Sequence, residues 1–310
     1  MGTFNQRPGD WVPFKDEKEL ERVRSIKRED ITNHPRPNVH ITVYKDSELE
    51  LVMLTDMFKR VMDSDRYDKK TVMIMPNPGT TYRKLAYMIN KFEINCRNLK
   101  FYMMDEWADN DGNIAPETYK AGFTNSFLRF FYSQVDEKLR MPRENIIGFT
   151  NENVSSYSKM IAEDGEADVI YSGPGWPGHL AFIDPVKDWF CDSMEEYIRQ
   201  PAKVAHLHPM TVLQNSLHGS FGYSGDVASV PSMGAMIGPR DVMNAKHIID
   251  VHGITTCGTK VAWQRMISRL CIHGPVCQEL PASILQLRET EVAVSESIAA
   301  TIEPDYFFQY

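Results

Sequence analysis

Cysteine is scarce in this sequence, with five residues in 310 at irregular spacing. An odd, scattered set in a chain of this length argues against a disulfide framework. Cys271 and Cys277 are the only close pair, and no second Cys or His pair at ligand spacing accompanies them, so no zinc site is expected. We expect buried free thiols instead.

Long hydrophobic runs and an excess of basic residues are also missing. No apolar run approaches the roughly 18 to 20 residues that span a bilayer, and the polar start MGTFNQRPGDW does not resemble a signal peptide. Acidic residues outnumber basic ones by 42 to 34, and the resulting net charge of −8 repels nucleic-acid phosphates. We therefore expect a cytoplasmic protein that binds neither membranes nor nucleic acids.

The composition that remains is that of a globular protein, with 42% hydrophobic and 25% charged residues. Residues 1–37 are rich in charge and proline and contain one helical stretch, 17–30. They are interpreted as an N-terminal extension. No repeat or low-complexity tract divides the remainder, so residues 38–310 are predicted to form one domain.

Short apolar runs alternate with amphipathic segments from residue 39 onward, a pattern typical of strands alternating with helices. The apolar runs indicate strands buried on both faces. We predict an α/β fold, a single Rossmann-like domain with a mainly parallel sheet flanked by helices. The expected strands are 40–44, 71–75, 99–104, 167–173, a segment near 204–207, 232–238 and 247–253, and the expected helices are 47–62, 81–92, 117–135, 259–270 and a segment around 282–287.

Ligands of open parallel sheets bind beyond the carboxyl ends of the strands, which directs attention to four loops. The first is a small, glycine-containing turn that opens a helix and suits a phosphate group. An ordinary turn with a threonine as N-cap is the alternative. The fourth loop, 253–260, brings a lysine near a helix start, where it either meets a phosphate or is simply solvated. The candidate phosphate ligands are Asn77, Gly79, Thr80, Thr81 and Lys260.

The second loop begins with two acids, Asp105 and Glu106, directly after a hydrophobic strand. A carboxylate shielded by the adjacent Trp107 can have its pKa raised toward the working pH, which suits proton transfer. A solvated turn is the alternative interpretation.

The third loop, 173–185, contains three glycines and three prolines around His179. Such a composition imposes a fixed backbone path that can hold the histidine in place. Asp184 follows five residues later and can orient the imidazole and stabilise its charged form. A structural histidine is the alternative.

Three motifs in order carry a family resemblance: P-N-P-G-T at 76–80, M-D-E-W at 104–107 and G-P-G-W-P-G-H-L-A-F-I-D-P at 173–185. The chain resembles the glucosamine-6-phosphate deaminase and 6-phosphogluconolactonase superfamily, and the deaminases more closely. Their segments look like P-T-G-G-T, M-D-E-Y and G-x-G-x-D-G-H-I-A-F-N-E-P. Residues 116–119 and 280–287 also match, so the resemblance covers about residues 38 to 300.

The resemblance implies conversion of an amino sugar phosphate to a ketose phosphate and ammonia, without a metal or organic cofactor. By position, His179 would open the sugar ring and Asp105 would move a proton between C2 and C1. Asp184 stands where the family has glutamate, and Glu106 completes the catalytic candidates. A positioned general acid or base contributes about 10² to 10⁴ in rate, so each role is testable.

Three positions depart from the family pattern. Pro177 replaces an aspartate and offers neither a carboxylate nor an N–H. Asp184 is one methylene shorter than glutamate, which puts its reach to the histidine in question. The phosphate-binding arginine aligns with Val212, and His208 or Lys260 are candidates to compensate for it.

Three functions remain open: a deaminase or isomerase that acts on the family's substrate or on an altered one, a non-catalytic sugar or sugar-phosphate binding protein, and a sugar-lactone hydrolase. The retained Asp105 and His179 favour the first, because a pure binding protein needs neither. Pro177 and Val212 favour the second, and the third needs His179 but little from Asp105. The expected partner is a small sugar or sugar phosphate, and a homo-oligomer is possible.

Overall fold

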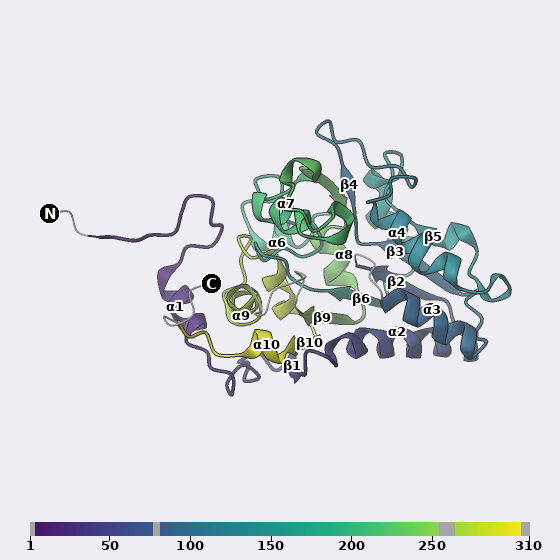
Figure 1. Cartoon of the computed structure of the whole chain (residues 1–310), viewed down its shortest axis with the longest axis horizontal. Coiled ribbons are helices and arrows are strands. Elements are labelled where there is room, and N and C mark those ends of the chain that lie inside the picture. The colour runs from purple at the N-terminus through teal and green to yellow at the C-terminus, as the bar shows by residue number, and fades with distance from the viewer. Residues whose placement is uncertain (1–3, 77–80, 254–263, 305–310) are drawn as a thin grey trace.

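The computed structural model describes residues 4–76, 81–253 and 264–304 (Figure 1). Seven strands within these residues form the main sheet: β1 (Val39–Tyr44), β2 (Thr71–Met75), β3 (Leu99–Met103), β5 (Ile146–Ile147), β6 (Val169–Ser172), β9 (Ile248–His252) and β10 (Thr290–Ser295). Their order is β1-β10-β9-β6-β2-β3-β5, and every neighbouring pair is parallel. The predicted α/β fold with a mainly parallel sheet is confirmed.

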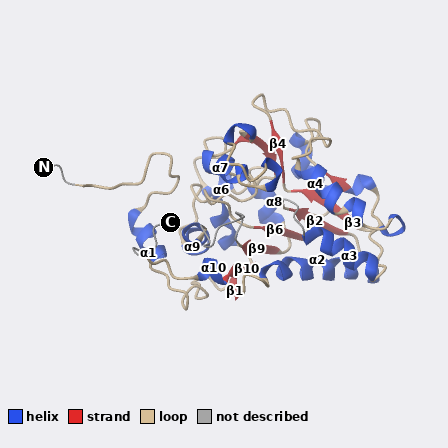
Figure 2. Ribbon diagram, viewed as in Figure 1, coloured by secondary structure: helices blue, strands red, loops and turns tan. Residues whose placement is uncertain are grey.

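Helices cover both faces of this sheet because its strands are apolar on both sides (Figure 2). Successive strand residues point to opposite faces. Met73 of β2 therefore packs in one cluster and Ile74 in another. The first cluster includes α2 (Leu49–Arg66), α3 (Thr81–Lys91) and α4 (Phe123–Phe130), and the second includes α5 (Tyr157–Glu163), α8 (Pro239–Asn244) and part of α9 (Arg265–His273).

A second, three-stranded antiparallel sheet accompanies the main one. It consists of β4 (Asp105–Ala108), β7 (Lys203–His206) and β8 (Met233–Met236), in the order β4-β8-β7. Strands near 204–207 and at 232–238 were predicted from the sequence, but as members of the parallel sheet. Strand β4 begins two residues after β3 ends, so the small sheet starts at the carboxyl edge of the large one.

Two further elements differ from expectation. The helix predicted over 117–135 begins only at Phe123, because Tyr119 and Gly122 close two successive turns and Gly122 has an extended backbone. Strand β10 was not expected, and it lies between β1 and β9. The late segment 281–287 is a 3₁₀ helix, and the other short helices are α6 (Met194–Tyr197), α7 (Pro209–Ser216) and α10 (Glu296–Ala299).

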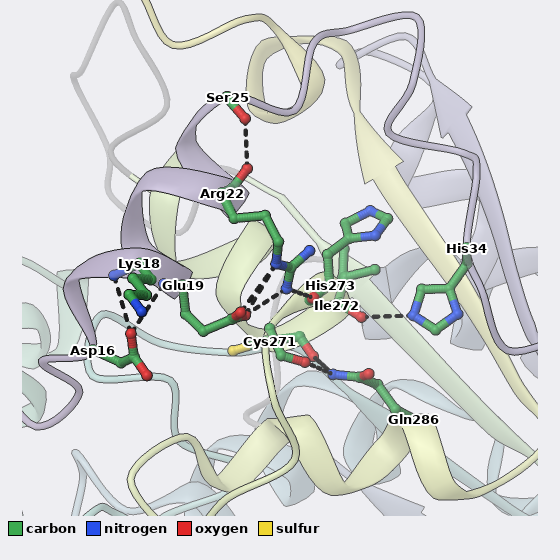
Figure 3. A network of polar contacts seen from close by, with 11 residues as sticks. Asp16, Lys18, Glu19, Arg22, Ser25, His34, Cys271, Ile272, His273 and Gln286 are labelled. Atoms are coloured by element: carbon green, nitrogen blue, oxygen red, sulfur yellow. Dashed lines mark hydrogen bonds and ion pairs between the residues drawn. The ribbon is translucent and has the colours of Figure 1, made fainter.

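The N-terminal segment packs on α9 through its own helix, α1 (Glu17–Arg24). Arg22 donates a hydrogen bond of 2.6 Å to the carbonyl of His273, and the His34 ring lies 2.9 Å from the carbonyl of Ile272 (Figure 3). Val23 is fully buried in a cluster with Leu270. Charged and apolar contacts thus fix the N-terminal segment to α9 of the α/β core.

Cys96, Cys191, Cys271 and Cys277 are free thiols, but only Cys96 and Cys271 are buried as expected, and Cys257 lies outside the described residues. Burial raises the pKa of Cys96 to about 12, which makes it a poor nucleophile. No helix in the described ranges combines the length and apolar character needed to cross a membrane. Over the same ranges, no three His, Cys, Asp or Glu side chains gather as metal ligands.

Candidate active site

Four loops that the sequence singles out begin at four adjacent strands. The strands β9, β6, β2 and β3 are consecutive in the sheet, so their carboxyl ends form one continuous edge. Asp105, predicted in a loop, instead begins strand β4 two residues after β3, whereas the loop carrying His179 follows β6, and β2 lies between β3 and β6. Adjacent strands are about 4.8 Å apart, so these two segments leave the sheet roughly 10 Å from each other.

His179 is hydrogen-bonded to the acid predicted to orient it. Its Nδ1 lies 3.0 Å from Asp184 Oδ1 and 3.0 Å from Thr211 Oγ1. The Thr211 hydroxyl donates to the same Asp184 oxygen at 2.7 Å, and the backbone N–H of His208 donates to the other at 2.8 Å. Asp184 is fully buried and reaches the ring despite being shorter than glutamate.

This arrangement fixes the tautomer of the neutral ring. Because the Thr211 hydroxyl gives its hydrogen to Asp184, it can only accept from His179. Nδ1 therefore carries the proton and donates to Asp184, and Nε2 is left with a free lone pair. A histidine in this state accepts a proton at Nε2 while the carboxylate stabilises the imidazolium that forms.

The backbone of the loop makes room for this ring. A Cβ on Gly175 would lie 2.2 Å from His179 Nε2 and 2.9 Å from Gln214 Oε1, so no larger residue fits without moving the histidine. Gly178 has a φ of +81° and Ala181 a φ of +54°, both in the left-handed region. The glycine-rich composition is thus required by the position of the histidine.

Asp105 is the first residue of β4 and is buried, with 6% of its surface exposed. Its Oδ1 is inaccessible to solvent and has no hydrogen-bond partner among the described residues. Burial, reinforced by the neighbouring charge of Glu106, raises the pKa of this carboxyl well above its usual range. A carboxyl with a raised pKa is a stronger base when ionised, which is the direction expected from the sequence for an acid beside Trp107.

Glu106 has a different role in the local structure. Its carboxylate accepts three backbone N–H groups, from Trp107 at 3.0 Å, Phe123 at 3.0 Å and Thr124 at 2.9 Å. The last two are at the start of α4, where a carboxylate also complements the helix dipole. These contacts favour a capping role for Glu106 over proton transfer.

Thr81, the described member of the predicted phosphate turn, is already hydrogen-bonded within the chain. Its hydroxyl donates to Glu50 at 2.7 Å, and the same carboxylate forms an ion pair with Lys84. Burial alone would raise the pKa of Glu50, but the bonds from Lys84 and Thr81 outweigh burial and lower it. The predicted ligands Asn77, Gly79, Thr80 and Lys260 lie outside the described residues.

His208, the candidate phosphate ligand after β7, and Val212, the position that lacks the family's arginine, both have structural contacts. His208 is the N-cap of α7, where its Nδ1 accepts the N–H of Met210 at 3.2 Å and its Nε2 lies 3.1 Å from the carbonyl of Trp11. Val212, where the family pattern has arginine, packs against the main apolar core. Both ring nitrogens of His208 are therefore engaged without a ligand.

A buried polar cluster at the same sheet edge was missed. The Ser172 hydroxyl donates to Asp250 at 2.6 Å, and His252 Nε2 lies 2.7 Å from the other oxygen of Asp250. All three side chains are buried, and they face one side of β6 and β9. Polar residues at alternate positions of otherwise apolar strands were the signal available in the sequence.

Known proteins resemble the chain in sequence and in fold, although no protein-family profile matches it. The glucosamine-6-phosphate deaminase of Corynebacterium aurimucosum is 24% identical over 236 residues, covering 75% of this chain and 83% of that protein. The enzyme of the same name from Corynebacterium efficiens is 26% identical over 236 residues, covering 74% and 83%.

Solved structures also resemble the chain in fold. A monomeric glucosamine-6-phosphate deaminase superimposes with a TM-score of 0.66 at 18% identity, covering 84% of this chain and 98% of that one. The 6-phosphogluconolactonase from Trypanosoma cruzi gives 0.59 at 15% identity, covering 86% and 98%. These similarities confirm the resemblance: the chain is similar in sequence to glucosamine-6-phosphate deaminases, and it shares its fold with the solved deaminase and 6-phosphogluconolactonase structures.

Proposed function

We propose that the protein converts a 2-amino-2-deoxy sugar or its phosphate, with one water molecule, to the corresponding ketose and ammonia. The observation that carries this proposal is the buried Asp184–His179 pair, which leaves Nε2 of His179 as a proton acceptor. That nitrogen would remove the proton of the anomeric hydroxyl and deliver it to the ring oxygen, which opens the pyranose.

Asp105 would carry the second step. Its carboxylate would take the proton from C2 of the open sugar and return it to C1, while a second proton passes from the amino nitrogen to O1, which leaves a C=N bond at C2. Water adds to that carbon, and the C–N bond breaks to release ammonia and form the ketone. The raised pKa of Asp105 supports this role, because it makes the carboxylate a stronger base toward the C2 proton.

The test is ammonia release from glucosamine and from glucosamine 6-phosphate. Asp105→Asn is expected to abolish release while sugar binding, followed by calorimetry, is preserved. Asp184→Asn is expected to lower kcat about 100-fold or more, because it removes the charge that stabilises imidazolium. Glu137→Ala, which changes an exposed acid, is the control and is expected to retain activity. Ammonia release that persists in Asp105→Asn would refute the assigned role.

A sugar-lactone hydrolase is the second candidate, since 6-phosphogluconolactonases share the fold. That reaction needs His179 to activate water but does not need a base at C2. Lactone hydrolysis that survives Asp105→Asn would select it. Binding without turnover of any amino sugar or lactone would select a non-catalytic sugar-binding protein.

A further inference from the structure

The N-terminal segment reaches the candidate active site through a continuous series of hydrogen bonds. The Trp11 carbonyl lies 3.1 Å from His208 Nε2, and the backbone N–H of His208 donates to Asp184 at 2.8 Å. Asp184 in turn binds His179 at 3.0 Å. A backbone atom from the first dozen residues is thus three contacts away from the imidazole assigned to ring opening.

The direction of each bond follows from donor and acceptor chemistry. The backbone N–H of Met210 can only donate, so His208 Nδ1 is an acceptor and carries no proton. The proton of the neutral ring is therefore on Nε2, and it is donated to the Trp11 carbonyl. Both ring nitrogens are satisfied only in this one protonation state.

Apolar side chains surround this part of the segment, although Trp11 itself is 64% exposed. A cavity of about 360 Å³ lies between the segment and the loop that carries His179. Trp11 and Phe14 line it from one side, and Trp176 and Pro177 of the catalytic loop line it from the other. Behind them, Arg22 and His34 fix the segment to α9 (Figure 3). The segment is therefore seated independently of the single bond to His208.

We propose that the N-terminal segment is a positioning element of the active site: the Trp11 carbonyl fixes the Nε2–H tautomer and the orientation of the His208 ring, and His208, fixed in this way, holds Asp184 against His179 through its backbone N–H. The inference rests on the proposed function in one respect, which is that His179 carries catalysis. It assigns a role to residues 9–13 that their sequence does not indicate.

Protonation of His208 would undo this arrangement. A proton on Nδ1 removes the acceptor for Met210, and the new charge competes with His179 for Asp184. Burial lowers the pKa of His208, and this outweighs the opposing effects of Asp184 and of the Trp11 carbonyl, while His179 lowers it further. On the segment itself, Asp10 and Lys15 form an ion pair beside Trp11. Removal of the segment admits water and brings the pKa of His208 back toward about 6.5.

Two matched deletions test the proposal in the full protein. Removal of residues 1–13 takes away Trp11 but leaves Phe14 and α1, whereas removal of residues 1–8 leaves Trp11 in place. The longer deletion is expected to lower kcat about 10- to 100-fold with little change in KM, and to move the acid limb of the kcat profile to higher pH. The shorter deletion is expected to behave as the full chain.

A rescue experiment distinguishes a positioning role of the segment from a simple loss of structure. His208→Asn in the longer deletion keeps an N-cap acceptor for Met210 but cannot titrate, so the acid limb is expected to return to its original position. His208→Asn in the full chain removes the bond to Trp11 without shortening the protein, and kcat is expected to fall there as well. A deletion of residues 1–13 that leaves kcat and its pH profile unchanged would overturn the proposal.

Nitrogen-15 NMR of the histidine rings gives a readout independent of activity. His208 is expected to show the Nε2–H form and a lowered pKa in the full chain, and a higher pKa after removal of residues 1–13. Equal titration of His208 in both proteins would overturn the inference. If no amino sugar is turned over by the full chain, the proposed function fails, and the NMR comparison still decides whether Trp11 locks His208.

Discussion

Asp105 and Glu106 are adjacent in β4, yet their carboxyl groups have opposite surroundings. Glu106 accepts three backbone N–H groups, whereas Asp105 Oδ1 accepts none from the described part of the chain. Because neighbouring strand residues point to opposite faces, Glu106 is hydrogen-bonded to the start of α4, whereas Asp105 Oδ1 has no hydrogen-bond partner among the described residues. The same strand thus provides both an anchor and a candidate base.

Asp105→Asn is expected to stabilise the protein at alkaline pH while it abolishes activity. The folded pKa of Asp105 is raised, so ionisation costs more in the folded state than in the unfolded state. The free energy of unfolding therefore falls as pH rises from about 4 toward the raised pKa. Asparagine removes this loss, and a gain of about 1 to 2 kcal/mol is expected at pH 8, with none at pH 4.

Urea unfolding of both proteins at pH 4 and pH 8 measures this difference. A stability gain that is equal at the two pH values would show that it arises from packing and not from the charge of Asp105.

Glu106→Ala is expected to destabilise the protein by about 3 kcal/mol, because three buried N–H groups lose their acceptor. Urea unfolding at pH 7 is the measurement. Glu137→Ala, an exposed acid of a short 3₁₀ helix, is the control and is expected to change the free energy of unfolding by less than about 0.5 kcal/mol. Similar values for the two variants would contradict the capping role.

Gly175→Ala is expected to lower kcat about 10- to 100-fold, because the added methyl group would lie 2.2 Å from His179 Nε2 and must displace the ring. Steady-state kinetics with an amino sugar measures the effect, and unfolding by urea checks that the fold is retained. Unchanged kinetics would mean that the position of the ring against Gly175 is not needed for catalysis.

Glu50→Gln is expected to improve the use of a phosphorylated amino sugar about tenfold relative to the free sugar. Glu50 places a negative charge on Thr81 at the start of α3, where it repels a phosphate in the neighbouring turn. The ratio of kcat/KM values for the two substrates is the measurement. Glu48→Gln, an exposed acid at the same end of α2, is the control. Equal ratios in all three proteins would show that Glu50 does not select against phosphate.

Five of the seven strands of the main sheet could be predicted from the sequence because they contain apolar runs, as in 71–75 and 99–104, whereas β5 and β10 were not expected. The small sheet could not. Its strands are four residues long, and β4 pairs with a segment far along the chain. No local pattern records such a pairing, and the short apolar segments are equally compatible with the parallel sheet.

The candidate site could also be predicted only in part from the sequence. His179 and Asp184 are five residues apart on one rigid loop, so their pairing follows from the sequence. The contacts of Thr211 and Trp11 bring in distant segments whose residue types carry no sign of that role. The departures Pro177 and Val212 were visible in the sequence, but only the structure shows that both lie in apolar surroundings.

The pairing of Asp105 with Met236 across β4 and β8 affects the timing of folding during synthesis. The surroundings of this carboxyl are completed only after most of the chain has left the ribosome, since β8 must be available to pair. A nascent chain that already carries β1, β2 and β3 therefore still lacks the small sheet. The environment of Asp105 forms late, when the segment around Met236 has been synthesised.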